Sequence, residues 1–369
     1  MLVRRLRTRT ATAAFGGSAT FGPEVPTIEV FGKDRAAVET CRAPPPTCSR
    51  RNHVRRLILL ALAAVTVAAC QRAEAPDSMP TGGFWSTAAI SDQEKLAVLR
   101  KVRALDVCAL LPRAALAGLG TVREIDNTDP HQCRAGIDVE GHLTGIDATW
   151  ATGVAFTTEP ITDGPVTEQA MGDVRVLFDD ESPASADPQV RGSCQAWARF
   201  VSGADLSLSV RAPQDACVTA EALLRIALVE WRGEPARGTS PDSDRTVVTG
   251  ADPCAVAPLL GVTVPVAGQR VTTCLLTVRD HEAIITYDYS TESSIRDDLP
   301  AFTVGARQVY RFDTAGAQPG IASLSAVVGP ALAADPADAL LGPRVPTVSV
   351  TADSAVAELV MRETLPLLR

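Results

Sequence analysis

The sequence is poor in aromatic residues, which make up 4% of its 369 residues. Carbohydrate sites and single-stranded nucleic-acid sites depend on aromatic side chains that stack on rings and bases. The low aromatic content therefore argues against both classes of ligand. Hydrophobic residues still make up 46% of the chain, so its cores must be built mainly from Ala, Val and Leu.

Lysine and asparagine are rare as well. Of the 35 basic residues only three are lysine, and asparagine occurs twice. Both amino acids use A-rich codons, so their scarcity indicates a GC-rich genome and favours an actinobacterial source.

The chain also lacks the common catalytic and metal-binding motifs. It contains no His-Glu-x-x-His, no phosphate-binding Gly-x4-Gly-Lys loop and no Gly-x-Ser-x-Gly. The histidines after residue 70 are His131, His142 and His281, and each is isolated. The acidic runs 179–181 and 297–298 lie in turn-like stretches typical of solvated charge. We therefore predict no catalytic residue, no metal site and no cofactor.

Long hydrophobic runs are missing, with one informative exception. The apolar run Leu57–Ala69 follows two arginines and ends at Cys70. Its 13 residues are too few to cross a bilayer, which takes about 20. Together with Cys70, the end of the run resembles a bacterial lipobox, in which the cysteine is acylated after the signal peptide is cut. This predicts a signal peptide over 54–69 and a diacylglycerol on Cys70.

The predicted signal peptide stands unusually far from the first residue. A secretion signal normally has only a short basic segment before its apolar run. We therefore interpret residues 1–53 as a doubtful extension and expect translation to start at Val54. The predicted product is exported and tethered to the outer face of the cell membrane. The general secretory route and the twin-arginine route both remain open.

The charge of the predicted mature chain is strongly negative. Residues 1–69 hold 11 of the 35 basic residues but only four of the 43 acidic ones, which leaves 24 basic and 39 acidic residues and a net charge of −15. Such a surface repels phosphate polymers, so nucleic acid is excluded as an expected partner.

The spacing of hydrophobic residues and the positions of turn residues predict an α+β fold in two tandem domains. Residues 70–90 have the composition of a tether, and Ser91–Glu94 form a capping box that opens the first domain over 91–232. Strands are expected at 121–125, 132–139, 143–150, 173–178, 194–200 and 205–210, followed by a helix over 218–231. Residues 233–245 are rich in Gly and Pro and predict a linker to a second domain over 246–369, which ends in a helix over 353–365.

The second domain repeats features of the first. Asp252-Pro-Cys254 echoes Asp106-Val-Cys108, and Cys274 falls in an expected strand as Cys133 does. Residues 310–313 likewise echo 175–179. We infer a duplication, with each antiparallel sheet packed by an N-terminal and a C-terminal helix and held by disulfides.

Six cysteines follow Cys70, and an even number in an exported chain favours disulfides. The repeat predicts that Cys108 bonds Cys133 and that Cys254 bonds Cys274. Cys194 and Cys217 have no counterparts in the second half, which predicts that they bond each other.

The lipobox and the Asp-Pro-Cys opening resemble a group of actinobacterial, mycobacterial-type secreted lipoproteins of uncharacterised function. Val107 departs from their pattern by replacing the proline in the first half. The resemblance implies an envelope location and a compact disulfide-bonded domain, and it carries no reaction.

Three functions stay open. The first, which we favour, is non-catalytic binding of a partner protein or a small apolar ligand. Tyr287 and Tyr289 alternate along one strand and are candidate groove residues, although packing in a core or at a sheet edge is the interpretation we favour for them. The second is an envelope hydrolase, which would need an apolar cleft holding His281 or Asp288. The third is a sensor or accessory subunit of a secretion or cell-wall assembly.

Overall fold

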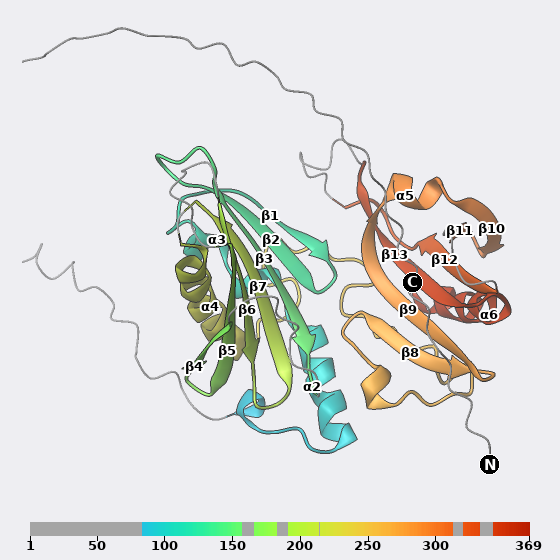
Figure 1. The fold of residues 1–369 in the computed structure, drawn as a ribbon. Coiled ribbons are helices and arrows are strands. Elements are labelled where there is room, and N and C mark those ends of the chain that lie inside the picture. Colours follow the sequence, from blue (N-terminus) through green and yellow to red (C-terminus); the bar gives the residue numbers. More distant parts are fainter. Residues whose placement is uncertain (1–82, 157–165, 183–190, 214, 313–319, 333–341) are drawn as a thin grey trace, which may run out of the picture. The chain divides into compact units, whose positions relative to one another are not determined.

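The structure, a computed structural model, describes residues 83–156, 166–182, 191–213, 215–312, 320–332 and 342–369. These residues are mostly β-strand and form two antiparallel sheets with a few helices, an α+β arrangement (Figure 1). Each sheet has its own cluster of buried apolar side chains. Residues 1–53, the predicted signal peptide and Cys70 lie outside the described part of the chain.

Sheet 1 has seven strands in the order β1-β2-β3-β7-β6-β5-β4. Strict alternation of buried and partly exposed residues along β3, β6 and β7 directs one face of the sheet toward a core. The strands are β1 (Thr121–Asp129), β2 (Gln132–Asp138), β3 (Ile146–Val154), β4 (Val166–Met171), β5 (Val174–Ser182), β6 (Gly192–Arg199) and β7 (Ala204–Ala212).

Sheet 2 has six strands in the order β10-β11-β12-β13-β9-β8. The strands are β8 (Thr273–Val278), β9 (His281–Thr291), β10 (Leu299–Val304), β11 (Arg307–Phe312), β12 (Ile321–Val327) and β13 (Arg344–Asp353).

The strand order of sheet 2 repeats that of sheet 1 without its first strand. In each sheet the last strand, β7 or β13, pairs with the strand that precedes the four-strand run, β3 or β9. Strands β4 to β7 therefore correspond to β10 to β13, and β2 and β3 correspond to β8 and β9. Strand β1 has no counterpart among the described residues of sheet 2.

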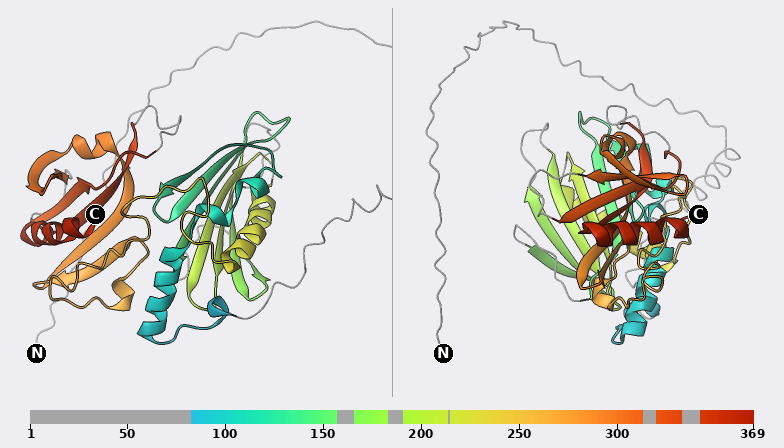
Figure 2. Two further views of the ribbon diagram at one scale, coloured as in Figure 1. Left: turned by 180° about the vertical axis from the view of Figure 1, so that it is seen from behind. Right: turned by 90° about the vertical axis from the view of Figure 1, so that its right-hand side faces the viewer.

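The final helix of each half packs on the same part of its sheet. Helix α4 (Ala216–Arg232) lies on β6 and β7, and α6 (Ser354–Thr364) lies on β12 and β13 (Figure 2). Both helices begin at an aspartate N-cap, Asp215 or Asp353, whose carboxylate accepts from the backbone N–H two residues on. The remaining helical segments are η2 (Phe84–Ser86), α2 (Asp92–Ala104), η3 (Cys108–Leu110), α3 (Arg113–Leu116), η4 (Val266–Gly268), α5 (Glu292–Arg296) and η6 (Leu365–Leu367).

The expected helix at the start of the second half is absent from the structure, which corrects the sequence prediction. Residues 252–261 form successive turns closed by i to i+3 hydrogen bonds instead. Pro258 lacks the N–H that would donate to Cys254 in an α-helix, and Gly261 follows three residues later at φ 67°. The first half does have its N-terminal helix, α2, with the predicted capping box at Ser91 and Glu94.

Three disulfides join the cysteines that the repeat had paired. They link Cys108 with Cys133, Cys194 with Cys217 and Cys254 with Cys274. The first and third attach the opening of each half to β2 or β8, and the second attaches α4 to β6.

Residues 233–245, expected to be a linker, lie against the first half. The carboxylate of Asp106 accepts from the backbone N–H of Ser240, and Asn127 Oδ1 accepts from the N–H of Asp244. The N–H of Asp106 in turn donates to the carbonyl of Pro235. Polar side chains of the first half thus fix the path of a segment whose composition indicates only a loop.

No helix among the described residues combines the length and apolar character needed to cross a membrane.

Candidate functional site

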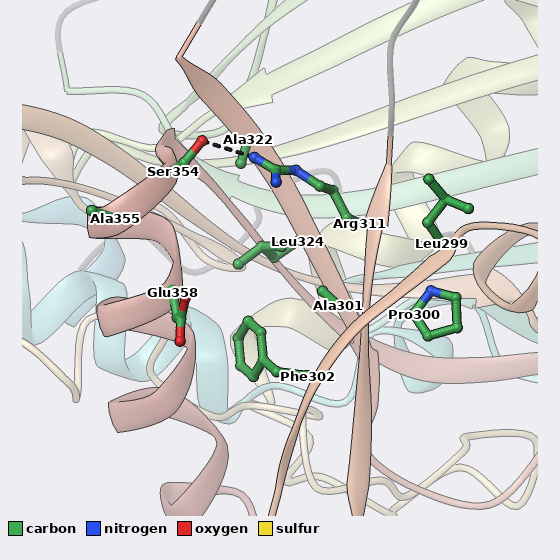
Figure 3. Close-up of a pocket in the computed structure, with 10 residues that line it drawn as sticks. All are labelled: Leu299, Pro300, Ala301, Phe302, Arg311, Ala322, Leu324, Ser354, Ala355 and Glu358. Atoms are coloured by element: carbon green, nitrogen blue, oxygen red, sulfur yellow. Dashed lines mark hydrogen bonds between the residues drawn. The ribbon is translucent and has the colours of Figure 1, made fainter.

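A groove lies beside the first turns of α6, where the sheet extends beyond the helix. Figure 3 shows its walls, α6 on one side and β10 on the other, with β11 and β12 beneath. Its volume is about 520 Å³, within the range of small-molecule sites. The lining residues are Leu299, Pro300, Ala301, Phe302, Arg311, Ala322, Leu324, Ser354, Ala355 and Glu358.

Small side chains keep the groove open. Ala322 lies on its floor, and Ala355 and Ala301 lie on its two walls, where longer side chains would close the gap. Leu299, Leu324 and Phe302 are the larger apolar side chains of the lining. Pro300 is compatible with β10 because β10 is an edge strand, and a register shift between Pro300 and Phe302 bends that edge.

Arg311 places a guanidinium in the groove. Its Nη2 donates to Ser354 Oγ at 2.8 Å, and Ser354 Oγ donates to the carbonyl of Gly320 at 3.0 Å (Figure 3). This chain of bonds fixes the side chain between β11 and the start of α6. No carboxylate of the described residues lies within ion-pair distance of Arg311.

The acidic residue of the groove is already paired. Glu358 accepts from Arg362, one helical turn further along α6, at 2.7 Å. The Arg362 guanidinium also lies over the ring of Phe302, 4.3 Å from its centroid. Arg311 is therefore the cation in the groove that has charge available for a ligand.

A second, smaller groove occupies the corresponding place in sheet 1. It lies between the start of α4 and strands β4 and β5, with a volume of about 240 Å³. Phe178 and Cys217 fill part of this space, and Asp180, Asp215 and Glu221 line it. Cys217 follows its N-cap by two residues as Ala355 follows Asp353, but Cys217 is bonded to β6. The two grooves therefore differ in size and in charge, because three carboxylates line the smaller one and one guanidinium and one carboxylate line the larger one.

Tyr287 and Tyr289 do not line a groove and instead pack in a core, which is the alternative that the sequence favoured. Both are buried in the core of sheet 2, with 1% and 5% of their surface exposed. Burial raises the pKa of both phenols, and the Tyr289 hydroxyl is 2.8 Å from Thr249 Oγ1. Alternation along β9 identified the shared face correctly, but that face is the packed one.

A titratable cluster surrounds Asp288. Burial, together with the nearby Asp129 carboxyl, raises the pKa of Asp288. His131 Nδ1 lies 2.6 Å from Asp129 Oδ1. None of these three residues lines the cavities described above, and His281 is exposed at the start of β9. The apolar cleft that a hydrolase would need at Asp288 or His281 is thus not among the described cavities.

Metal-ligand geometry is absent from the described residues: no group of three or more His, Cys, Asp or Glu side chains converges there. In the acidic run 179–181, Asp179 is buried, Asp180 faces the smaller groove, and Glu181 accepts from Ser193 Oγ.

Sequence reasoning missed the groove, although it had noted the segment that carries Arg311. In the match of residues 310–313 to 175–179, Phe312 and Asp313 stand against Phe178 and Asp179, so the match does not mark Arg311 as a groove residue. Strand β10 contains Pro300 and few buried residues, so its pattern gives no indication of a groove wall.

Comparisons with known proteins add little to the description of the groove. No family model matches the sequence, and no curated protein matches it. Among solved structures, the chain is similar to DynU16, a protein of the dynemicin biosynthetic locus, with 11% identity over 77% of this chain and 93% of that one and a TM-score of 0.12. It is also similar to the di-domain ARO/CYC BexL of the BE-7585A pathway, with 10% identity over 75% and 86% of the two chains and a TM-score of 0.13. Scores this low bear on neither fold nor function.

Proposed function

We propose that this chain is an exported lipoprotein, anchored to the outer face of the cell membrane through a diacylglycerol on Cys70, that binds a small apolar ligand without transforming it. The groove beside α6 carries the proposal, because it combines about 520 Å³ of space with a lining of apolar side chains and the guanidinium of Arg311. The three disulfides support export to an oxidising compartment.

We further propose that the two halves are related domains produced by duplication. The shared strand order, the corresponding C-terminal helices and the corresponding first and third disulfides support this origin. On this view the first half keeps a small groove and the second half a larger one. Ligand binding then belongs to the second half.

The experiment is recovery of the native protein from cell envelopes, followed by untargeted lipid analysis and protein identification. Ala355→Trp fills the groove of sheet 2 from an exposed position, and Val218→Trp places the same bulk at the groove of sheet 1. We expect a discrete small molecule to copurify with the wild type and with Val218→Trp and to be lost from Ala355→Trp. A stoichiometric protein in place of a small molecule would support the accessory-subunit alternative.

The lipid anchor has its own measurement. Intact-mass analysis of the native protein should show a diacylglycerol at Cys70, and Cys70→Ala should abolish it. An unmodified Cys70 in the wild type would contradict the anchoring.

A further inference from the structure

The two ends of the groove differ in charge, and this difference narrows the class of ligand. At one end Arg311 has one hydrogen bond to the described residues, to Ser354 Oγ, although a guanidinium has five N–H donors. At the other end the ring of Phe302 is covered by Arg362, whose charge is balanced by Glu358. One end of the groove is therefore suited to an anion, and at the other end an aromatic ring lies beside a charge-balanced ion pair.

The surroundings of Arg311 also favour an anion. Its partner Ser354 is the first residue of α6, and the N-terminus of a helix carries a positive partial charge. The N-cap Asp353 uses its carboxylate on the N–H of Ala355, within the helix itself. Because Ser354 fixes the Arg311 side chain before a ligand arrives, less conformational freedom is lost on binding.

We propose that the ligand of this groove is a single-chain carboxylic acid amphiphile, with its carboxylate bound by Arg311 and its chain lying over Leu324 toward Phe302. This inference rests on the proposed function of the groove. A guanidinium and a carboxylate match in shape and form paired N–H···O bonds. One guanidinium suits a single negative charge better than the nearly double charge of a phosphate monoester.

The corresponding groove of sheet 1 explains why one half alone binds this ligand. There Asp180 and Asp215 line the cavity, and Glu221 pairs with Arg225 in the same i to i+4 arrangement as Glu358 with Arg362. No guanidinium or ammonium group lines it. A carboxylate would meet like charge in a smaller space, which disfavours binding.

The test compares two fluorescent probes that differ only in charge, 11-(dansylamino)undecanoic acid and its methyl ester. Each is titrated into the purified full-length protein in detergent-free buffer. We expect the acid to bind at least about tenfold more tightly than the ester to the wild type, because a charge-assisted pair distinguishes them. Arg311→Gln should remove this preference, and Arg311→Lys should restore part of it.

Two control variants separate this inference from the function on which it rests. Ala355→Trp should abolish binding of both probes, and Arg225→Gln, which removes a guanidinium from α4, should change neither. Equal binding of acid and ester, both lost in Ala355→Trp, would overturn the carboxylate assignment and leave the groove as a site for apolar ligands. Binding of neither probe, or binding that Ala355→Trp leaves intact, would overturn the function of the groove and the assignment together. A phosphate-headed probe, dodecyl phosphate, that displaces the acid and binds more tightly than it would also refute the carboxylate assignment.

Discussion

The two halves share a strand order but use different side chains to complete their cores. All four tryptophans (Trp85, Trp150, Trp197, Trp231) belong to the half that contains sheet 1, and all three tyrosines (Tyr287, Tyr289, Tyr310) belong to sheet 2. Trp85, Phe200 and Trp231 pack together with ring centroids 4.8 to 6.1 Å apart. The core of sheet 2 is built mainly from Val, Ala and Leu, with Tyr287 and Tyr289 among them.

This contrast shows that one strand order can be combined with different packing beside the C-terminal helix. At the start of α4, the ring of Phe178 and the additional disulfide between Cys194 and Cys217 occupy part of the flank of sheet 1. In sheet 2 the same flank is lined by alanines, and a groove of about twice the volume remains. We interpret the first half as the more rigid one and the second half as the one that keeps space for a ligand.

The largest expected effect tests the cluster of aromatic rings in the core of sheet 1. Trp231 is fully buried in α4 and contacts Trp85 and Phe200, so Trp231→Ala leaves a large cavity. We expect a loss of about 4 kcal/mol in the free energy of unfolding. Urea denaturation followed by tryptophan fluorescence measures it, because the tryptophans report on the first half.

The same variant tests whether each half of the chain unfolds independently of the other. Hydrogen exchange should accelerate in β5 to β7 and stay nearly unchanged in β12 and β13. Val229→Ala, on the same helix but 59% exposed, is the control and should change stability by less than about 0.5 kcal/mol. Equal acceleration in both sheets would show one cooperative unit and remove the basis for comparing two domains.

A second prediction concerns the disulfide that only the first half has. Replacing Cys194 and Cys217 together by alanine opens a loop with a sequence separation of 23 residues. We expect a loss of about 3 kcal/mol, mostly through the greater freedom of the unfolded chain. Thermal unfolding of the double variant, beside one with Cys254 and Cys274 replaced, measures both disulfides on one scale.

If the Cys194–Cys217 disulfide also holds the sheet 1 groove closed, the double variant should bind the dansylated probes at a second site. An unchanged stoichiometry would show that Phe178 and the acidic lining are sufficient to exclude them.

The sequence predicted the parts of this fold that depend on local pattern. The capping box at Ser91, the alternating strands and the three cysteine pairs follow from hydrogen bonding, from the two-residue period of a strand and from repetition. Strand β4 was missed because Val166–Met171 has a single buried residue, at its end. Nothing in such a segment distinguishes an edge strand from a loop.

The groove could not be predicted because it depends on what neighbouring segments leave unfilled. Arg311, Ala322 and Ala355 come from three elements, and none is unusual in its own segment. Tyr287 and Tyr289 show why two interpretations stayed open, since alternation identifies a face of a strand but not which side of the sheet is covered. Only packing of α6 decides that question.

The third prediction uses a buried carboxyl group of sheet 1. Burial raises the pKa of Asp205 in β7 to about 6, despite the opposing charges of Arg199 and His131. An unfolded aspartate has a pKa of about 3.9, so the folded chain binds more protons between about pH 4 and pH 6. The free energy of unfolding therefore falls as pH rises through this window, and the loss is complete above about pH 6.

Asp205→Asn should remove this pH dependence. We expect the variant to gain about 2 kcal/mol relative to the wild type between pH 4 and pH 7.5, measured from urea midpoints. Asp138→Asn, at a carboxyl group that is 61% exposed, is the control and should give a profile parallel to the wild type. Asp288→Asn should act in the same direction as Asp205→Asn, because burial and Asp129 raise the pKa of Asp288. Parallel profiles for Asp205→Asn and the wild type would contradict the assignment.

The smallest expected effect tests whether the polar atom of a buried aromatic ring contributes a hydrogen bond to stability. Trp231 Nε1 has no hydrogen-bond partner among the described residues, whereas Tyr289 Oη lies within hydrogen-bond distance of both Thr249 Oγ1 and Thr246 Oγ1. We expect Tyr289→Phe to cost about 1 kcal/mol, the usual net value of one hydrogen bond. In a double-mutant cycle with Thr249→Val, the two costs should not add, because either substitution breaks the same bond. Additive costs would mean that the hydroxyl contributes nothing through Thr249.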